Sequence, residues 1–502
     1  MPALAEQLPR LRLVSDSLLE LDYQLRPQAK WDNGQPVLAA DIVFTLKLLY
    51  CPGLPNERAR TEMGFIKDCR TDPADPRHLT LICQGQAPEY QWAASDFPVL
   101  PESALDSAHT LRAVSLPELR RGAAASPAVA AFVARYRQAN VGRYPAHLPG
   151  CGPYRLADWQ TNRVLRFERK SEWWADKLSA PPFVLQAHPR QLQFLIIPDA
   201  TAAALALRRH ELDVLPQVPA PLFKQLQQSE TRQELAFYTT TSYNVVTVGF
   251  NTERPTLRDK YTRRALGQLL DPAALAQATQ QVPGLRTASI LPPTSPYYND
   301  SLPLPAYNPG QAAALLRRAG WQRQADGHWY RAAQPTPLAL DLRYRSDDAM
   351  LSTVGLQLQQ AAAQLGIAVT LWPTEGTLLA QTLQAGNFDA YVKMTKGSPF
   401  VLNFSPLLHS QAIGAGNLTR FSNPASDRLL DAIGVEGRPA RKRQLLRQFQ
   451  RLLRDEAPLV PLFMLPNRLV ADRRLRHITP SGLKPGYVAA AMTWAANTAA
   501  GR

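Results

Sequence analysis

The sequence predicts a protein of the α/β class that is built from two or more lobes. In the C-terminal half, three strand-like runs alternate with two helix-like segments, which is typical of parallel sheets with right-handed crossovers. The strands are expected at 338–342, 367–371 and 388–393, and the helices at about 347–365 and just before Gly386. A strand, an Ala-rich helix and another strand also follow one another between residues 194 and 215. Each half of the chain therefore has an α/β unit of its own.

Residues 1–170 are predicted to form paired strands and short helices. Residues 21–26 alternate apolar and polar side chains, as a half-buried strand does. Asn33-Gly34 signals a tight turn, and Asp41 opens an apolar helix in which an acidic first turn suits the helix dipole. Two hairpins are expected, one of residues 65–69 with 78–83 and one of residues 154–159 with 163–169. A helix-forming stretch is expected between them, over 100–145.

Capping residues locate the helices of the later part. An Asp or Asn side chain can accept the free N–H groups of a first turn, and proline is favoured at the first helical position. The predicted caps are Asp199 for a helix over 200–210, Asn308 before Pro309, and Asn423 before Pro424. A strand over 245–250 that ends at Asn251, a long helix over about 438–455 and an apolar run over 459–465 complete the chain.

The charge of the chain is strongly positive but does not indicate a nucleic-acid partner. The 502 residues carry 56 Lys and Arg against 41 Asp and Glu, a net charge of +15, and only 11 of the basic residues are Lys. The densest group of basic residues lies between 438 and 454 at helical spacing, which favours a solvated helix face over a binding surface. No run approaches the roughly 18 apolar residues of a membrane helix.

Four cysteines, at positions 51, 69, 83 and 151, form no C-x-x-C pair, so a zinc or redox motif is not expected. Cys69 and Cys83 flank a turn-rich stretch between two predicted strands. They could form a disulfide across this hairpin, or they could be two unrelated buried thiols.

Signatures of catalysis are missing from the sequence. It contains no G-x-S-x-G, no P-loop and no H-E-x-x-H motif. His210-Glu211 lacks a second metal ligand, and Asp347-Asp348 is expected to supply charge at a helix N-terminus rather than an acid/base pair. We therefore predict no catalytic residues, no metal site and no cofactor. This favours a binding protein over an enzyme.

An ordered series of short motifs resembles the extracellular solute-binding proteins of peptide and nickel ABC importers. Each motif is weak alone, but their order is that of the family and they extend over almost the whole chain. They are Trp31-Asp32-Asn33-Gly34, Ala40-Asp41-Ile42-Val43-Phe44, Gly150-Cys151-Gly152-Pro153-Tyr154, Asp199-Ala200-Thr201-Ala202, Phe250-Asn251, Tyr307-Asn308-Pro309, Asn423-Pro424 and Asp455-Glu456-Ala457-Pro458.

The resemblance implies a two-lobed periplasmic-binding-protein fold of type II that closes on its ligand. Lobe one would comprise residues 1–147 with an inserted subdomain, an α/β core over 148–252, and a return of the chain over 476–502. Lobe two would comprise 253–475. The chain would cross between the lobes near Asn251 and near residues 474–480.

The start of the chain departs from the family pattern. Relatives carry a signal peptide and a further stretch before the first motif, whereas Met1–Gln7 has neither a basic nor an apolar region. We expect a misassigned or truncated start, with lobe one incomplete at its N-terminus and the strand 21–26 without its usual preceding neighbours. The resemblance implies a periplasmic or otherwise extracytoplasmic, membrane-associated location.

The ligand is expected where the strands of the α/β lobes end, because ligands of open α/β sheets bind beyond the carboxyl ends of strands. We predict a cleft between the loop 394–400 and the strand end near Asn251. The candidate ligand-binding residues are Tyr243, Asn244, Phe250, Asn251, Lys393, Thr395, Lys396 and Phe400. Peptide-binding relatives carry an acidic residue in the matching loop, where this chain has Thr395. The ligand's amine is therefore held elsewhere, or the ligand is not an ordinary free peptide. Lys393 and Lys396 could favour an anionic group, or they could be two solvated lysines on a surface loop.

The leading hypothesis is a substrate-binding component that captures peptides and delivers them to the permease of an ABC importer. It would act as a monomer, without nucleic acid. The alternatives are a receptor for a non-peptide solute, such as a metal chelate, an opine or an oligosaccharide, and an enzyme of unrecognised type.

Overall fold

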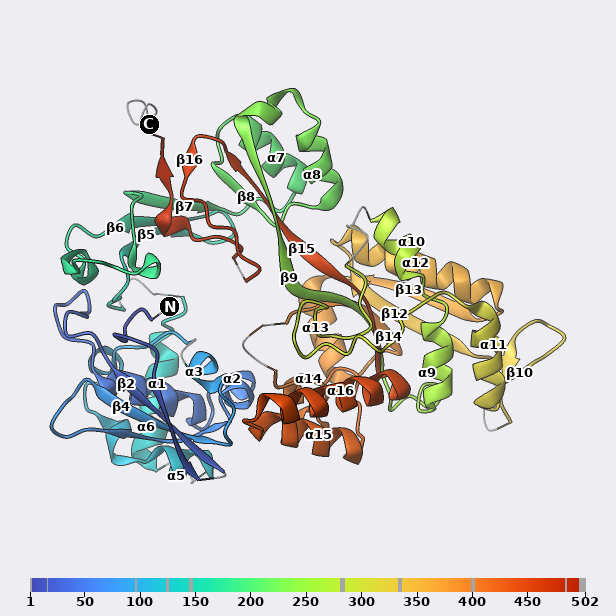
Figure 1. Ribbon diagram of the computed structural model, residues 1–502, viewed down its shortest axis with the longest axis horizontal. Coiled ribbons are helices and arrows are strands. Elements are labelled where there is room, and N and C mark those ends of the chain that lie inside the picture. Colours follow the sequence, from blue (N-terminus) through green and yellow to red (C-terminus); the bar gives the residue numbers. More distant parts are fainter. Residues whose placement is uncertain are drawn as a thin grey trace.

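The structure is a computed structural model that describes residues 2–15, 17–94, 97–122, 126–143, 148–279, 285–332, 336–397, 399, 402–483 and 485–495. In Figure 1 the first 140 residues form one unit, a small antiparallel sheet lies above it, and a larger α/β body lies on the other side. A twisted ribbon of two long strands, β9 and β15, joins the upper part to the α/β body.

The N-terminal unit is a four-stranded antiparallel sheet, in the order β1-β2-β4-β3, with short helices. Its strands are β1 Arg10–Ser15, β2 Leu18–Gln24, β3 Ile66–Thr71 and β4 His78–Gln84. Its helices are α1 Ala39–Tyr50, α2 Glu57–Glu62, α3 Tyr90–Ala93, α4 Glu102–Leu105, α5 Leu116–Arg120 and α6 Pro127–Ala139. The predicted hairpin of residues 65–69 and 78–83 is confirmed as β3 and β4.

Asp41 ties the start of α1 to its surroundings, as the sequence predicts for an acid in the first turn. Its carboxylate accepts hydrogen bonds from the backbone N–H of Leu38 at 2.9 Å, from that of Glu102 at 2.9 Å and from Trp31 Nε1 at 3.2 Å. Burial raises the pKa of Asp41, and these hydrogen bonds oppose the rise.

The strand predicted at 21–26 is β2, and one part of that prediction is wrong. We expected this strand to lack preceding neighbours, but β1 pairs with it along one edge and β4 along the other. All six residues of β1 are exposed, so β1 is the edge strand of the sheet. Arg10–Ser15 alternates Arg and Leu at its start, which is the pattern of a half-buried strand, so the signal for this neighbour was present in the sequence and was overlooked.

The second sheet, in the order β5-β6-β7, is also antiparallel. It consists of β5 Tyr154–Gln160, β6 Val164–Arg169 and β7 Gln191–Leu195, and it is followed by α7 Ala200–Arg208, β8 Val214–Pro216 and α8 Ala220–Gln227. The short strands β16 Leu475–Arg476 and β17 Thr493–Trp494 pair with each other near this sheet (Figure 1). The hairpin of β5 and β6 and the Asp199 cap of α7 are confirmed, the latter by a 2.6 Å bond from Ala202 N–H.

The α/β unit predicted between residues 194 and 215 does not exist as such. The strands β7 and β8 belong to different sheets, and β8 pairs with β15. The apolar run that we took for a buried strand is exposed at Phe194, Leu195 and Ile196, because β7 is an edge strand of a small sheet. A short apolar run does not by itself distinguish a buried strand from an edge strand.

The large body is a six-stranded sheet, in the order β13-β12-β14-β9-β15-β8, with helices on both faces. Its strands, apart from β8, are β9 Leu235–Phe250, β12 Ala339–Arg345, β13 Ala368–Thr374, β14 Ala390–Thr395 and β15 Leu459–Asp472. Its helices are α9 Lys260–Gly267, α10 Pro272–Ala278, α11 Pro309–Arg318, α12 Ala349–Gln364, α13 Gly376–Ala385, α14 Ser405–Leu408, α15 Pro424–Val435 and α16 Pro439–Glu456. A hairpin of β10 Gln322–Arg323 and β11 Trp329–Tyr330 projects from it (Figure 1). The predicted parallel arrangement of β12, β13 and β14 is confirmed.

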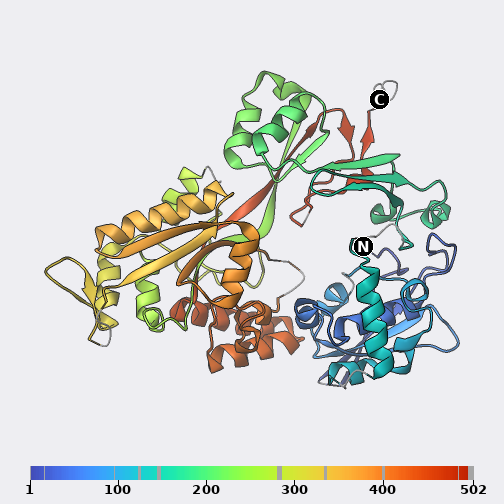
Figure 2. The same cartoon turned by 180° about the vertical axis from the view of Figure 1, so that it is seen from behind.

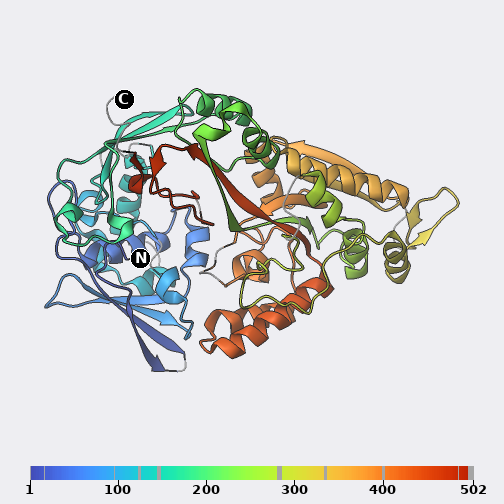
Figure 3. The same cartoon turned by 45° about the horizontal axis from the view of Figure 1, so that its top comes forward.

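The strand predicted at 245–250 is only the second half of β9, which begins at Leu235 and pairs with β15 along almost its whole length. The start of β9 and the end of β15 lie together in the upper part of Figure 1, whereas the end of β9 and the start of β15 lie in the α/β body. Figures 2 and 3 show the same arrangement from other directions. We propose that the chain crosses between lobe one and lobe two within β9 and β15. On this proposal the crossings would precede the expected places near Asn251 and residues 474–480, since Asn251 follows the end of β9 and is buried beside β14.

All four cysteines are free thiols, so the alternative of a Cys69–Cys83 disulfide is not realised. The register explains this result, because Cys69 faces Leu81 and Cys83 faces Ile66 across the β3–β4 pair. Burial raises the pKa of the Cys51, Cys69 and Cys83 thiols to about 12 and that of Cys151 to about 11.

We expect the native chain to resist alkylation by iodoacetamide at about pH 8, because thiols with such raised pKa values hold very little thiolate. Denatured chain should take up label at all four cysteines, as counted by intact mass. Fast labelling of the native chain would contradict the burial of the thiols, and two missing labels after denaturation would indicate a disulfide.

Candidate functional site

The β9–β15 ribbon is interrupted where it passes between the two lobes. Asn244 faces Leu465, but the next pair is Thr241 with Pro466, so Ser242 and Tyr243 bulge out of the ladder. The Ser242 hydroxyl, which is fully buried, donates to the Leu465 carbonyl and accepts from Asn244 N–H at 3.1 Å. Pro466 has no N–H to give to the ladder. The ladder has a second irregularity between Pro461 and Phe463. We propose that the lobes bend relative to each other at the bulge of Ser242 and Tyr243, which lies between them.

The carboxyl end of β14 lies beside this point. The strand β14 runs antiparallel to β9, so Thr395 faces Val245 and Lys393 faces Thr247. The Thr247 hydroxyl lies 3.1 Å from that of Thr395 and 3.3 Å from the Lys393 carbonyl oxygen. Lys393 is exposed and Thr395 is half-buried. We call this polar surface the hinge patch, defined as Tyr243, Asn244, Lys393, Thr395 and Lys396, and the fully buried Thr247 lies beneath it.

Tyr243 is enclosed by backbone from both lobes. A Cβ on Gly397 would lie 2.6 Å from the Tyr243 carbonyl oxygen, and a Cβ on Gly482 would lie 2.3 Å from the Thr241 carbonyl oxygen. Gly482 also approaches the Tyr243 ring, and the neighbouring Ser481 carbonyl accepts a hydrogen bond from the Thr240 hydroxyl at 3.2 Å. The loop after β14 and the chain that follows β15 thus both lie against β9 at this point.

Two predicted site residues do not belong to this surface. Phe250 is fully buried in the main core of lobe two. Asn251 is 2% exposed, and its side-chain amide donates to the carbonyls of Gly386 and Phe388 at 3.0 and 3.1 Å. The predicted cleft between loop 394–400 and Asn251 is wrong because β14 is antiparallel to β9, so the carboxyl ends of the two strands point in opposite directions.

The other predicted residues are brought together. Tyr243, Asn244, Lys393, Thr395 and Lys396 all lie at the hinge end of the lobe-two sheet. Phe400 lies outside the described residues. The sequence from Met394 to Asn403 contains no Asp or Glu, so the hinge patch has two lysines and no carboxylate of its own loop.

A second contact between the lobes lies away from the hinge and was missed by the sequence analysis. We call it the latch, defined as residues 85–90 of the N-terminal unit and 434–442 of lobe two. Gln86 N–H donates to the Val435 carbonyl at 2.9 Å, and the Tyr90 hydroxyl donates to the Gly434 carbonyl at 2.5 Å. Figures 1 and 2 show the same two parts side by side from opposite directions.

A buried ion pair between Glu89 and Lys442 completes the latch. The Lys442 side chain is 3% exposed and that of Glu89 is 16% exposed, and Lys442 Nζ also donates to the Glu436 carbonyl at 3.3 Å. No local pattern in the sequence signals this contact, because its partners are more than 300 residues apart. The solvated helix face expected between 438 and 454 is wrong at Lys442, which points from α16 into the contact between the lobes and is buried there.

Two glycines permit the close approach of the lobes at the latch. A Cβ on Gly85 would lie 2.7 Å from the Val435 Cα, and a Cβ on Gly437 would lie 2.6 Å from both the Cβ and the carbonyl oxygen of Gln86. Contacts under about 3 Å are closer than packed side chains tolerate. Closure at this point therefore depends on the absence of side chains at Gly85 and Gly437.

Within the described ranges, no three His, Cys, Asp or Glu side chains gather as metal ligands. In the same part of the chain, no helix combines the length and the apolar character that crossing a membrane requires. The candidate site is thus a polar surface at a hinge, with a latch on the far side of the two lobes.

Comparison with known proteins identifies the family to which the chain belongs. Residues 1–412 match the family described as bacterial extracellular solute-binding proteins, family 5 Middle, and the chain belongs to this family. The expectation that followed from the ordered motifs is thereby confirmed.

Curated relatives of the chain have different named solutes. It is 26% identical over 323 residues to heme-binding protein A of Haemophilus influenzae, which covers 62% of this chain and 54% of that protein. It is 22% identical over 482 residues to the oligopeptide-binding protein AppA of Bacillus subtilis, which covers 94% of this chain and 80% of that protein. The chain thus spans about half the length of heme-binding protein A.

Solved structures confirm the two-lobed periplasmic-binding-protein fold. The Bacillus subtilis oligopeptide-binding protein AppA, in complex with a nonapeptide, superimposes with a TM-score of 0.78 at 19% identity and covers 98% of this chain and 90% of that chain. NikZ of Campylobacter jejuni, in complex with Ni(L-His), gives a TM-score of 0.71 at 19% identity and covers 95% and 86%. At such identities the likeness concerns the fold.

Proposed function

We propose that the chain is the substrate-binding component of an ABC importer, that it captures a peptide between its two lobes, and that it delivers this peptide to a membrane permease. The observation that supports this proposal is the pairing of an irregular hinge in β9–β15 with a latch on the far side of the lobes. A protein that closes around a solute needs a bending point and a contact that forms only on closure. An extracytoplasmic location and action as a monomer are part of the same proposal.

The hinge patch would recognise the main chain of the peptide. Polar side chains such as Tyr243, Asn244 and Thr395 offer donors and acceptors to a peptide backbone, which gives binding without a narrow sequence preference. The charge of Lys393 and Lys396, in a loop without acidic residues, favours an anionic group of the ligand over its amine. We therefore propose that the carboxylate end of the peptide, rather than its amino end, lies nearest to the hinge patch.

The second candidate is a receptor for an anionic metal chelate. The same loop favours it, because the positive charges of its two lysines suit a negatively charged complex as well as a peptide carboxylate. The solved relatives include proteins in complex with Ni(L-His) and with Fe(III)-EDTA, besides those with peptides.

Thr395→Asp is expected to change the ligand preference toward free amines. The new carboxylate would lie in the hinge patch beside Thr247, and a partly exposed charge pair contributes up to about 1 kcal/mol, or roughly fivefold in affinity. The measurement compares the affinities of one peptide with a free and with an acetylated amino end. Thr161→Asp, an exposed turn residue of the β5–β6 hairpin, is the matched control. An unchanged preference in a folded Thr395→Asp chain would count against this placement.

A further inference from the structure

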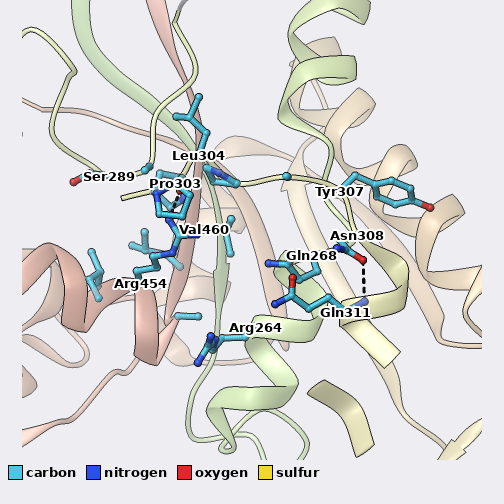
Figure 4. Close-up of a pocket in the computed structure, with 18 of the residues that line it drawn as sticks. Arg264, Gln268, Ser289, Pro303, Leu304, Tyr307, Asn308, Gln311, Arg454 and Val460 are labelled. Carbon is cyan, nitrogen blue, oxygen red and sulfur yellow. Dashed lines mark hydrogen bonds between the residues drawn. The ribbon is translucent and has the colours of Figure 1, made fainter. Parts of the chain in front are cut away.

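Lobe two contains a cavity of about 390 Å³ that shares no residue with the hinge patch or the latch. It lies between the end of α16, the helix α9, the first residues of β15 and the segment 303–308 that leads into α11 (Figure 4). Its volume falls within the range of roughly 300–1,000 Å³ that is typical of small-molecule sites. Because lobe two alone forms it, a ligand could enter without any movement of lobe one.

Two arginines contribute to the wall of the cavity. Burial lowers the pKa of Arg454, and the nearby charge of Arg264 adds to this effect. Arg454 donates to the Pro303 carbonyl, while Arg264 has an ion pair of 3.6 Å with Asp455, whose side chain is 67% exposed. The wall thus has two guanidinium groups, while the carboxylate that pairs with Arg264 lies mostly in solvent and outside the lining. A bound anion would relieve the repulsion between the two cations.

Two side-chain amides lie at another part of the cavity. Figure 4 shows Gln268 and Gln311 beside each other, at the junction of α9 and α11. The hydrogen bonds that both residues make within the described chain use their backbone groups, including Gln311 N–H to the Asn308 side chain at 2.9 Å. Their amides are therefore available to a ligand.

The rest of the lining is mixed, since Ser289, Asn308 and Gln450 contribute to it beside apolar residues. Leu304 and Pro305 come from the segment before α11, and Leu459, Val460 and Pro461 come from the start of β15. The cavity thus combines polar groups with one apolar part, as a site for a small organic molecule does. Guanidinium groups pair with carboxylates through two parallel hydrogen bonds, which favours this anion.

We propose that this cavity is a second ligand site, which binds a small organic carboxylate with an apolar body. The carboxylate lies at Arg264 and Arg454, the apolar body lies against Leu304 and Val460, and Gln268 and Gln311 supply hydrogen bonds. The site is independent of the solute that the two lobes enclose.

The test measures binding of four carboxylates to the full chain by calorimetry: benzoate, octanoate, 4-phenylbutanoate and indole-3-acetate. We expect at least one to bind saturably with a Kd of about 1 mM or tighter. The matching uncharged amide should bind about tenfold more weakly, since hydrogen bonds to charged groups are the stronger ones. Equal affinity of acid and amide, or no saturable binding of any of the four, would overturn the proposal.

Variants locate the site. Arg454→Gln and Gln268→Leu should each weaken binding of the carboxylate by about tenfold, and Gln268→Leu tests the site without removing the Arg454 bond to Pro303. Arg451→Gln, an exposed change on the same helix, and Lys393→Met, in the hinge patch, should leave it unchanged. Full binding by both cavity variants, or loss of binding in Lys393→Met instead, would show that the carboxylate binds elsewhere.

Discussion

Glu89→Gln is expected to weaken solute binding by roughly 150-fold, because it leaves the Lys442 ammonium buried without a counter-charge in the closed form. Removal of one member of a buried ion pair costs about 3 kcal/mol or more, which corresponds to this change in affinity. The Lys442 side chain is only 3% exposed, and its partner comes from the other lobe. When the lobes separate, water can solvate the ammonium. The cost therefore falls on closure and not on folding.

The measurement for Glu89→Gln combines a binding titration with thermal unfolding of the ligand-free chain. Glu168→Gln is the matched control, since Glu168 pairs with Arg155 on the surface, where both side chains are exposed by 42% and 69%. Such a surface pair contributes about 0–1 kcal/mol. A Glu89→Gln chain that binds as tightly as the Glu168→Gln chain would contradict the role of the latch.

Gly437→Ala is expected to keep the lobes apart and to weaken solute binding by roughly thirtyfold. The added Cβ would lie 2.6 Å from the backbone carbonyl oxygen of Gln86, so the two segments cannot keep their present distance. Overpacking of this kind costs about 2 kcal/mol, which gives the stated change in affinity. Gly437 does not have a positive φ, so alanine strains no backbone there.

Small-angle scattering with and without ligand tests the Gly437→Ala prediction, because an open form has a larger radius of gyration. Gly434→Ala is the matched control, since a Cβ at Gly434 would meet nothing within 4 Å. Equal compaction and equal affinity of the two variants would show that the close approach at Gly437 is not needed for closure.

The sequence predicts those parts of the fold that depend on local chemistry. Asp199, Asn308 and Asn423 each accept an N–H of the helix that they were predicted to begin. The alternation of strands and helices from 339 to 395 predicts three neighbouring parallel strands, as the lobe-two sheet has them. These features are readable because the residues that decide them lie within a few positions of one another.

Features that depend on distant contacts could not be predicted in this way. The antiparallel direction of β14 beside β9 removes Phe250 and Asn251 from the site, and nothing near these residues reveals it. The first half of β9 was missed because Thr239, Thr240 and Thr241 do not form an apolar run, although they pair with β15. Gly437 and Gly85 likewise resemble ordinary turn residues until the opposite lobe is in place.

The central claim is that the chain retains a peptide between its two lobes. The most direct measurement is the mass spectrum of solutes released on denaturation, after ligand-free chain has been incubated with a tryptic digest of casein and passed through a gel-filtration column. The account predicts near-stoichiometric peptide from the unaltered chain and from Glu168→Gln, and much less from Glu89→Gln. Folded chain that retains no peptide, or equal retention by Glu89→Gln, would contradict it.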